Sequence, residues 1–204
     1  MIAETVLPGW APYFSEWKMK DPDTWDESLI PEILENLKRE FAGRGLSADP
    51  TAQAVRKLFR QAGTDPTKYR PSFEALARRM LKEEPFPRLH PAVDFGNLLS
   101  LLWHVPCCVS DREKVFPPVR MRAGTAGETV ESLRGPFSLE GKPLLEDDRG
   151  VYSTPITDSR RTAVQAGAAS ILFVAYFPEE AFHQKQADAD LARLLPRAPV
   201  VACD

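Results

Sequence analysis

The stretch ILFVAYF at residues 171–177 decides the fold that we expect for this chain. A continuous apolar run of this length is typical of a central strand that is buried on both faces. The stretch PAVDFGNLLSL at residues 91–101 predicts a helix with one charged side chain, Asp94, close to its start. A helix that is apolar on nearly every side belongs in the interior. We therefore expect a buried central helix that packs against a sheet.

The other helices follow from apolar spacing and from capping residues. Apolar side chains at three- and four-residue intervals predict a helix over residues 27–41. Asp49, followed by a proline, and Gly63 predict the start and the end of a second helix. Ser72 is expected to be the N-cap of a third helix that runs to about residue 84. A polar helix is expected over residues 178–195.

The strands are expected in the second half of the chain, where the residues become β-rich. Gly, Pro and Asp turns separate three short β-rich segments, at residues 119–122, 128–130 and 150–153. The fold class is therefore α+β, with a mostly antiparallel sheet packed on helices. We expect a helical N-terminal segment at residues 1–65 and the main domain at residues 66–204.

Composition narrows the class of protein. The chain has 204 residues, 43% hydrophobic and 27% charged, and a formal net charge of −3, which is ordinary for a globular protein. No apolar run approaches the roughly 20 residues of a membrane span, so no membrane partner is expected. The first residues lack the features of a signal peptide. Three cysteines without a paired spacing indicate reduced thiols and a cytoplasmic protein.

Positive charge gathers in one part of this acidic chain. Residues 56–82 contain eight Lys or Arg residues and two Asp or Glu residues. Such a patch suits a transient contact with a polyanion, although a solvated basic helix face is the plainer interpretation. The candidate RNA-binding residues are Arg56, Lys57, Arg60, Arg78, Arg79 and Lys82.

Three blocks occur in a fixed order along the chain: YRPSFEAL at residues 69–76, the stretch at residues 91–101, and DSRRT at residues 158–162 before the apolar strand. Together they resemble the B3/B4 module of the bacterial phenylalanyl-tRNA synthetase β subunit, and more closely its free-standing single-domain relatives. In the synthetase that module hydrolyses mischarged tRNA. The resemblance implies a B3/B4-like fold, the acceptor end of aminoacyl-tRNA as partner, and ester hydrolysis that uses no cofactor and no metal.

The chain departs from the synthetase at two positions of the implied site. Cys108 stands where the synthetase has its editing-site histidine, and Val174 stands where a glutamate selects the tyrosine hydroxyl. A valine cannot accept that hydrogen bond, so tyrosine is not the amino acid expected here. The asparagine of the family survives as Asn97, and the preceding Gly96 opens space beside the pocket.

These residues give a candidate site. Asn97, Ser159 and Arg160 are the catalytic candidates, because amide, hydroxyl and guanidinium groups can orient an activated ester and a water molecule. Arginine can also grip phosphate or carboxylate bidentately. The substrate-binding candidates are Gly96, Cys108, Asp158, Arg161 and Val174. Two structural alternatives stay open: the Asn97 amide bonds a neighbouring backbone group, or Arg161 pairs with an internal carboxylate such as Asp158 or Asp94.

Other readings of the sequence remain. A non-catalytic module that binds RNA or a small molecule would keep the fold without the chemistry. A cysteine-dependent hydrolase would use Cys108 with His104. The three histidines lack the spacing of a helical metal pair, and the acidic residues at 146–148 are expected to be a solvated turn. The N-terminal tryptophans are expected to pack across the sheet, or else to form a partner surface.

Overall fold

Strand β9 (Ser170–Pro178) is the central strand of one sheet in this computed structural model, which describes residues 3–18, 25, 27–195 and 201–202. It pairs antiparallel along all nine residues with β2 (Trp10–Lys18). On its other side it pairs with β3 (Cys107–Asp111). β10 (Val201–Ala202) extends the sheet beyond β2. The buried central strand predicted at residues 171–177 is confirmed.

Strand β9 serves two cores because its side chains alternate between the two faces of the sheet. Phe173 and Ala175 belong to a core on the helical side, whereas Leu172 and Tyr176 belong to a core on the opposite side. Helix α4 (Pro91–Trp103) packs in the first core, where Phe95, together with most of its apolar neighbours, is buried. The sheet is therefore covered on both faces, and the predicted buried helix is confirmed.

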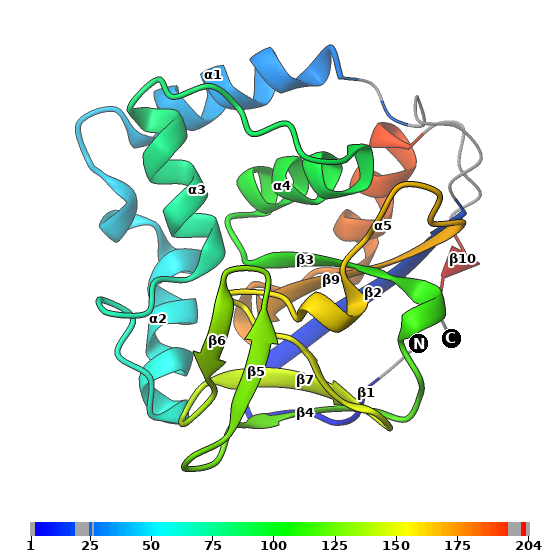
Figure 1. Ribbon diagram of the computed structural model, residues 1–204. Coiled ribbons are helices and arrows are strands. Elements are labelled where there is room, and N and C mark those ends of the chain that lie inside the picture. Colours follow the sequence, from blue (N-terminus) through cyan, green and yellow to red (C-terminus); the bar gives the residue numbers. More distant parts are fainter. Residues whose placement is uncertain (1–2, 19–24, 26, 196–200, 203–204) are drawn as a thin grey trace.

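The helices surround the sheet unevenly (Figure 1). α4 lies over β3 in the centre of the view, and α3 (Ser72–Leu81) stands beside α2 (Pro50–Ala62) at one edge. α1 (Leu29–Phe41) and α5 (Gln184–Leu194) contribute side chains to the helical-side core. α2 instead supplies Val55 and Phe59 to the core on the other face.

A second, smaller sheet closes the core on the other face of β9. Its strand order is β1-β4-β7-β8, and every pair is antiparallel except β1 with β4. A separate hairpin, β5-β6, stands in front of both sheets in Figure 1. The bounds are β1 (Ala3–Thr5), β4 (Val119–Ala123), β5 (Thr129–Ser132), β6 (Gly135–Ser138), β7 (Pro143–Asp147) and β8 (Gly150–Ser153). The α+β class with mostly antiparallel strands is confirmed.

The helix ends agree with the capping residues in α2 and differ in α3. The Asp49 side chain accepts a hydrogen bond from the Ala52 N–H at 2.8 Å, and Gly63 adopts φ 99° after the last turn. α3 begins with Ser72 as its first helical residue, and it ends at Leu81, earlier than expected. The final helix starts only at Gln184, after a short 3-10 turn, η4 (Glu179–Ala181).

The N-terminal tryptophans are buried, as the packing interpretation required. Trp10, Trp17 and Trp25 are each less than 10% exposed, and Trp17 stacks on Phe173 of β9 with ring centroids 5.1 Å apart. The strand that carries two of them, β2, was not predicted from the sequence. The boundary expected between residues 65 and 66 stays a prediction. None of the helices in the described residues is long and apolar enough to span a membrane.

Candidate functional site

A cavity of about 220 Å³ lies at the open edge of strand β3, between helix α4 and the loop that follows β8. Four of the candidate residues line it: Gly96 and Asn97 from α4, Cys108 from β3, and Asp158. Most of the other lining groups are apolar, and they come from the loop before α4, from α4, β3, the β5-β6 turn and the segment after residue 162. The list is Leu89, His90, Val93, Cys107, Val109, Leu133, Ala163 and Val164.

Gly96 and Asn97 reach the cavity because α4 crosses β3 closely. A Cβ atom on Gly96 would lie 2.5 Å from Cγ2 of Val109 on β3, so only glycine permits this approach. Asn97, the next residue, is half-buried and lines the cavity. The imidazole of His90 caps the helix, with Nδ1 accepting from the Ala92 N–H at 3.2 Å. Gly96 therefore sets the approach of the helix, and the expectation that it opens space beside the pocket stays a prediction.

Asp158, which is half-buried, brings a carboxyl group to the cavity wall. Ser153 Oγ donates to its Oδ1 at 3.0 Å, and the Cys108 thiol is a neighbour. Burial raises the pKa of Asp158 to about 7, because the bonds from Ser153 and Cys108 to the charged form offset only part of the lost hydration. A carboxyl group with such a value can exchange a proton at neutral pH.

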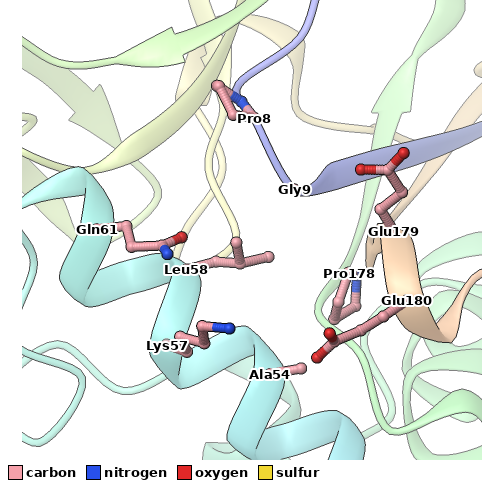
Figure 2. Close-up of a pocket in the computed structure, with 9 residues that line it drawn as sticks. All are labelled: Pro8, Gly9, Ala54, Lys57, Leu58, Gln61, Pro178, Glu179 and Glu180. Carbon is pink, nitrogen blue, oxygen red and sulfur yellow. The ribbon is translucent and has the colours of Figure 1, made fainter.

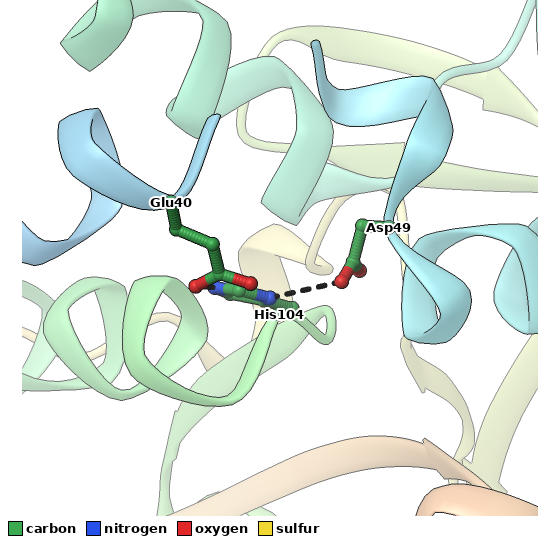
Figure 3. Close-up of side chains that lie close together, drawn as sticks. All are labelled: Glu40, Asp49 and His104. Atoms are coloured by element: carbon green, nitrogen blue, oxygen red, sulfur yellow. Dashed lines mark hydrogen bonds and ion pairs between the residues drawn. The ribbon is translucent and has the colours of Figure 1, made fainter. Parts of the chain in front are cut away.

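Cys108 is close to Asp158 but not to His104. Burial raises the pKa of the Cys108 thiol well above its ordinary value, with the Asp158 charge adding to the effect. The His104 ring is used elsewhere: its Nδ1 lies 3.3 Å from Asp49 Oδ1, and its Nε2 lies 3.5 Å from Glu40 Oε2 (Figure 3). The thiol–imidazole dyad that the sequence left open is therefore contradicted.

Glu40, Asp49 and His104 are also the group that comes nearest to a metal site among the described residues (Figure 3). Their ligand atoms lie within 4.8 Å of one another. The two carboxylates, however, approach different nitrogens of one imidazole ring, and one ion can use only one of these lone pairs. The arrangement is thus that of a histidine held between two acids, where α1, α2 and the end of α4 meet.

The other residues of the DSRRT block serve the fold. Arg161 donates to Asp147 Oδ1 at 2.8 Å and also to the backbone carbonyls of Lys114 and Gly150. An internal ion pair was the alternative left open for Arg161, and its partner is Asp147 rather than Asp158 or Asp94. Asp147 is buried, whereas Asp148 is exposed in the β7-β8 turn, so the expected solvated turn is wrong for Asp147 and not for Asp148.

Four candidates do not line the cavity: Arg161, Ser159, Arg160 and Val174. Ser159 is buried, and its Oγ accepts from the backbone N–H of Arg161 at 3.2 Å, which caps the 3-10 turn η3 (Arg160–Thr162). Arg160 is exposed on that turn. Val174 points into the core between the two sheets, on the same face as Leu172. Roles for Ser159, Arg160, Arg161 and Val174 in substrate binding or catalysis stay predictions.

A basic groove of about 380 Å³ adjoins the cavity. The two share Leu89 and Asn97, so Asn97 lies at their junction. Four cationic side chains line the groove and none of its lining residues is acidic; the cations are Lys68, Arg70, Arg79 and Arg134. The groove lies between the start of α3, the loop before α4 and the β5-β6 turn. Arg79 is also paired with Glu84 at 2.8 Å.

The six predicted RNA-binding residues are spread over different surroundings. Only Arg79 lines the groove. Arg56 forms an ion pair with the buried Glu74 at 2.8 Å, which ties α2 to α3. Lys57 lines a separate cavity of about 470 Å³ between α2 and the start of β2, where Glu179 and Glu180 are also found (Figure 2). The remaining three are exposed on α2 and at α3: Arg60, Arg78 and Lys82.

The groove cations outside the predicted set had only a weak sequence signal. Lys68 and Arg70 fall in the basic segment at residues 56–82, but in the loop before α3 rather than on a helix. Arg134 comes from the β5-β6 turn, which the linear sequence does not place near α3. Charge counts alone therefore located part of the groove, and the RNA-binding roles of the six residues stay predictions.

A mostly apolar cavity therefore opens beside a groove lined by cations. The family model of the B3/4 domain matches residues 54–192, more than half of the chain. The chain belongs to the B3/4 domain family.

Solved structures and curated proteins were compared as well. The chain is similar to an N-terminal fragment of the phenylalanyl-tRNA synthetase β subunit from Pyrococcus horikoshii, with 15% identity, a TM-score of 0.39, and coverage of 83% of this chain and 40% of that chain. It is also similar to the C-terminal domain of TILS, with 20% identity, a TM-score of 0.31, and coverage of 36% and 71%. The chain thus spans less than half of the synthetase fragment. No curated protein matches it.

Proposed function

We propose that this B3/4 domain protein binds the acceptor end of aminoacyl-tRNA and hydrolyses the ester of mischarged tRNA in the cytoplasm. The observation that carries the proposal is the junction of the cavity with the basic groove at Asn97. In aminoacyl-tRNA a small acyl group is followed by a chain of phosphates. The apolar cavity and the basic groove follow one another in the same order. The free thiols of Cys107, which is half-buried, and Cys108, which is buried, fit a reducing compartment.

The dimensions favour the acyl group as the occupant of the cavity. At about 220 Å³ the cavity is smaller than the ~300–1,000 Å³ of pockets that bury drug-sized ligands, so it suits one amino-acid moiety and not a whole nucleoside. Aliphatic side chains such as Val93, Val109 and Val164 make an apolar acyl group the better fit. The ribose and the terminal phosphates would then extend past Asn97 into the groove.

The chemistry asked of the site is modest because an aminoacyl ester is already activated. Holding the ester and a water molecule in the correct geometry contributes several kcal/mol to such a reaction. Among the described residues no hydrogen bond to the Asn97 side chain is formed, and the residue is half-buried at the junction. Its amide is thus available to hold the ester carbonyl or a ribose hydroxyl.

The test is deacylation of a panel of cognate and mischarged aminoacyl-tRNAs by the wild type and by Asn97→Ala, Cys108→Ala and Arg160→Ala. We expect selective ester loss that Asn97→Ala reduces at least tenfold and that Cys108→Ala retains, because a buried neutral thiol is no nucleophile. Activity abolished by Cys108→Ala would contradict the proposed water-based mechanism.

Binding is tested separately, with deacylated tRNA and increasing salt. Two to four phosphate contacts predict a log–log salt slope between about −1.5 and −3 for single-stranded contacts. The double variant Arg70→Ala, Arg134→Ala should weaken binding and flatten the slope by about 1 to 2. Lys185→Ala with Arg193→Ala, which removes two exposed cations of α5, is the matched control.

The competing function is a B3/4 module that binds RNA or a small molecule without hydrolysis. The hydrogen bonds of Ser159 and Arg161 favour this binding function, because the two side chains already have partners within the protein. Salt-dependent tRNA binding without deacylation of any substrate would select this function over the hydrolase.

A further inference from the structure

A chain of buried polar groups runs from the core between the sheets to the cavity wall. The hydroxyls of Tyr176 on β9 and Ser153 on β8 lie 2.6 Å apart, and Ser153 Oγ lies 3.0 Å from Asp158 Oδ1. Serine has a single hydroxyl proton, which goes to the carboxylate, so Tyr176 is the donor to Ser153. Both hydroxyls are in residues less than 2% exposed. Asp158 is the end of this chain that reaches the cavity.

Asp158 is the group of this cluster whose pKa lies near 7, because its titratable neighbours stay neutral at that pH. Burial raises the pKa of the Cys108 thiol on β3 and of the Tyr152 and Tyr176 hydroxyls well above their ordinary values, so these three stay neutral. His90, across the cavity on the cap of α4, accepts a backbone hydrogen bond at Nδ1. No Lys or Arg side chain is among the described residues that line the cavity.

We propose that Asp158 is the general base of this site and that Ser153 positions it. This role for Asp158 rests on the function proposed above. The carboxyl group lines the cavity in which the acyl group would be bound, one oxygen is fixed by Ser153, and the surroundings are apolar. The sequence resemblance assigned it no more than substrate contact.

The reaction step balances without a co-reactant. The Asp158 carboxylate removes a proton from water as the water oxygen bonds to the acyl carbon. The bond from that carbon to the ribose oxygen then breaks, and the leaving ribose oxygen takes the proton from Asp158. The products are the free amino acid and tRNA with an intact terminal hydroxyl, and the carboxylate is regenerated. Water is the only other reactant, so no oxidant, metal or cofactor enters the step.

The experiment compares Asp158→Asn with the wild type on the best substrate of the panel. Asparagine has the same shape and cannot accept the proton, so kcat should fall about 10²- to 10⁴-fold while KM changes less than threefold. The kcat–pH profile of the wild type should rise through an inflection near pH 7, and Asp158→Asn should lack the inflection. Asp148→Asn, which changes an exposed acid in the β7-β8 turn, is the matched control.

Two further variants show which group causes the inflection in the kcat–pH profile. Ser153→Ala removes a hydrogen bond that favours the charged carboxylate, so the inflection should move to higher pH while KM is kept. His90→Asn retains a good N-cap residue, and it should leave the inflection in place. An inflection that vanishes in His90→Asn and persists in Asp158→Asn would assign the base to the histidine and overturn the proposal.

A stability measurement separates a misassigned base from a wrong function. Because the folded protein holds the Asp158 proton more tightly than the unfolded chain does, the wild type should lose stability as pH rises from about 4 to 7. Asp158→Asn should therefore melt at a higher temperature than the wild type at pH 8, and this rules out misfolding as the cause of a lost rate. If the wild type is active and Asp158→Asn is equally active, Asp158 is not the general base, while the proposed function stands. A wild type that deacylates no substrate overturns the proposed function and the base with it.

Discussion

Gly96 shows how one residue can fix both a packing distance and a site. Its missing Cβ lets α4 approach β3, and the next residue of the helix is Asn97 at the junction of the cavity and the groove. Gly96→Ala would place a methyl group 2.5 Å from Val109 Cγ2 and 3.8 Å from the Phe173 ring. The free energy of unfolding should fall by about 1–3 kcal/mol, as is typical of an overpacked core. Denaturant unfolding monitored by circular dichroism gives this value.

Val109→Ala provides the control for that clash. If the contact with Val109 is the cause, the alanine at residue 96 should be tolerated better in the Val109→Ala background than in the wild type. An equal loss of stability in the two backgrounds would mean that another contact limits the position.

At the residue scale, four of the candidates from the sequence line one cavity: Gly96, Asn97, Cys108 and Asp158. Their roles in binding or catalysis stay predictions. The Arg161–Asp147 pair could not be assigned, because several carboxylates compete for one guanidinium and only the fold decides among them. The same applies to Arg134, which reaches the groove from a turn far along the chain.

Helix α2 begins at a residue whose two carboxylate oxygens have different partners. Asp49 Oδ2 accepts from the Ala52 N–H at 2.8 Å, and Oδ1 lies 3.3 Å from His104 Nδ1. Burial alone would raise the pKa of Asp49, but the hydrogen bonds from His104 and Ala52, with the Arg44 charge nearby, hold it below its ordinary value. The cap therefore links the start of α2 to the end of α4.

Asp49→Ala should lower the free energy of unfolding at pH 7 by about 2 kcal/mol, since it removes the cap and the bond to His104. Asp49→Asn should lose less, because asparagine is an equally good N-cap. The folded-state pKa is below the unfolded value of about 3.9, so the contribution of the charge is present above pH ~4 and is lost as pH falls below it. Urea titrations at pH 3, 5 and 7 measure the difference in free energy of unfolding between the wild type and Asp49→Ala. A difference that grows below pH 4 would contradict the expected direction of the pKa shift.

Elements defined by local signals were predictable, and those defined by distant pairing were not. α2 was found from Asp49 and Gly63, both of which act within one turn. β2 was missed because its sequence, WAPYFSEWK, mixes aromatic and charged residues and contains a proline, which argues against a strand. The proline is tolerated because β10 pairs only with Ser15 and Glu16, which leaves that side of Pro12 without a strand neighbour among the described residues.

At the scale of the whole molecule, β2 and β9 join two cores that would otherwise be separate. β2 sends Tyr13 and Trp17 to the helical-side core and Trp10 and Phe14 to the opposite core. The match to the B3/4 family begins only at residue 54, beyond this strand. Because this strand pairs along nine residues with β9 and buries aromatic rings on both faces, we expect it to belong to the same folding unit.

A fragment of residues 54–204 should consequently fail to fold cooperatively, although it contains the whole family match. Without β2 the long edge of β9 is unpaired, and the apolar surfaces that Trp10 and Trp17 cover are exposed, which favours aggregation. Far-UV circular dichroism and thermal unfolding compare the fragment with the full chain.

The control is a full chain cleaved at a protease site inserted in the exposed turn between Gly43 and Gly45, in which both parts remain present. Because β2 is still available to pair, the cleaved chain should keep its cooperative transition, so a loss confined to the fragment is assigned to the strand and not to the chain break. A fragment that unfolds in the same cooperative transition as the full chain would instead place the boundary of the folding unit after β2.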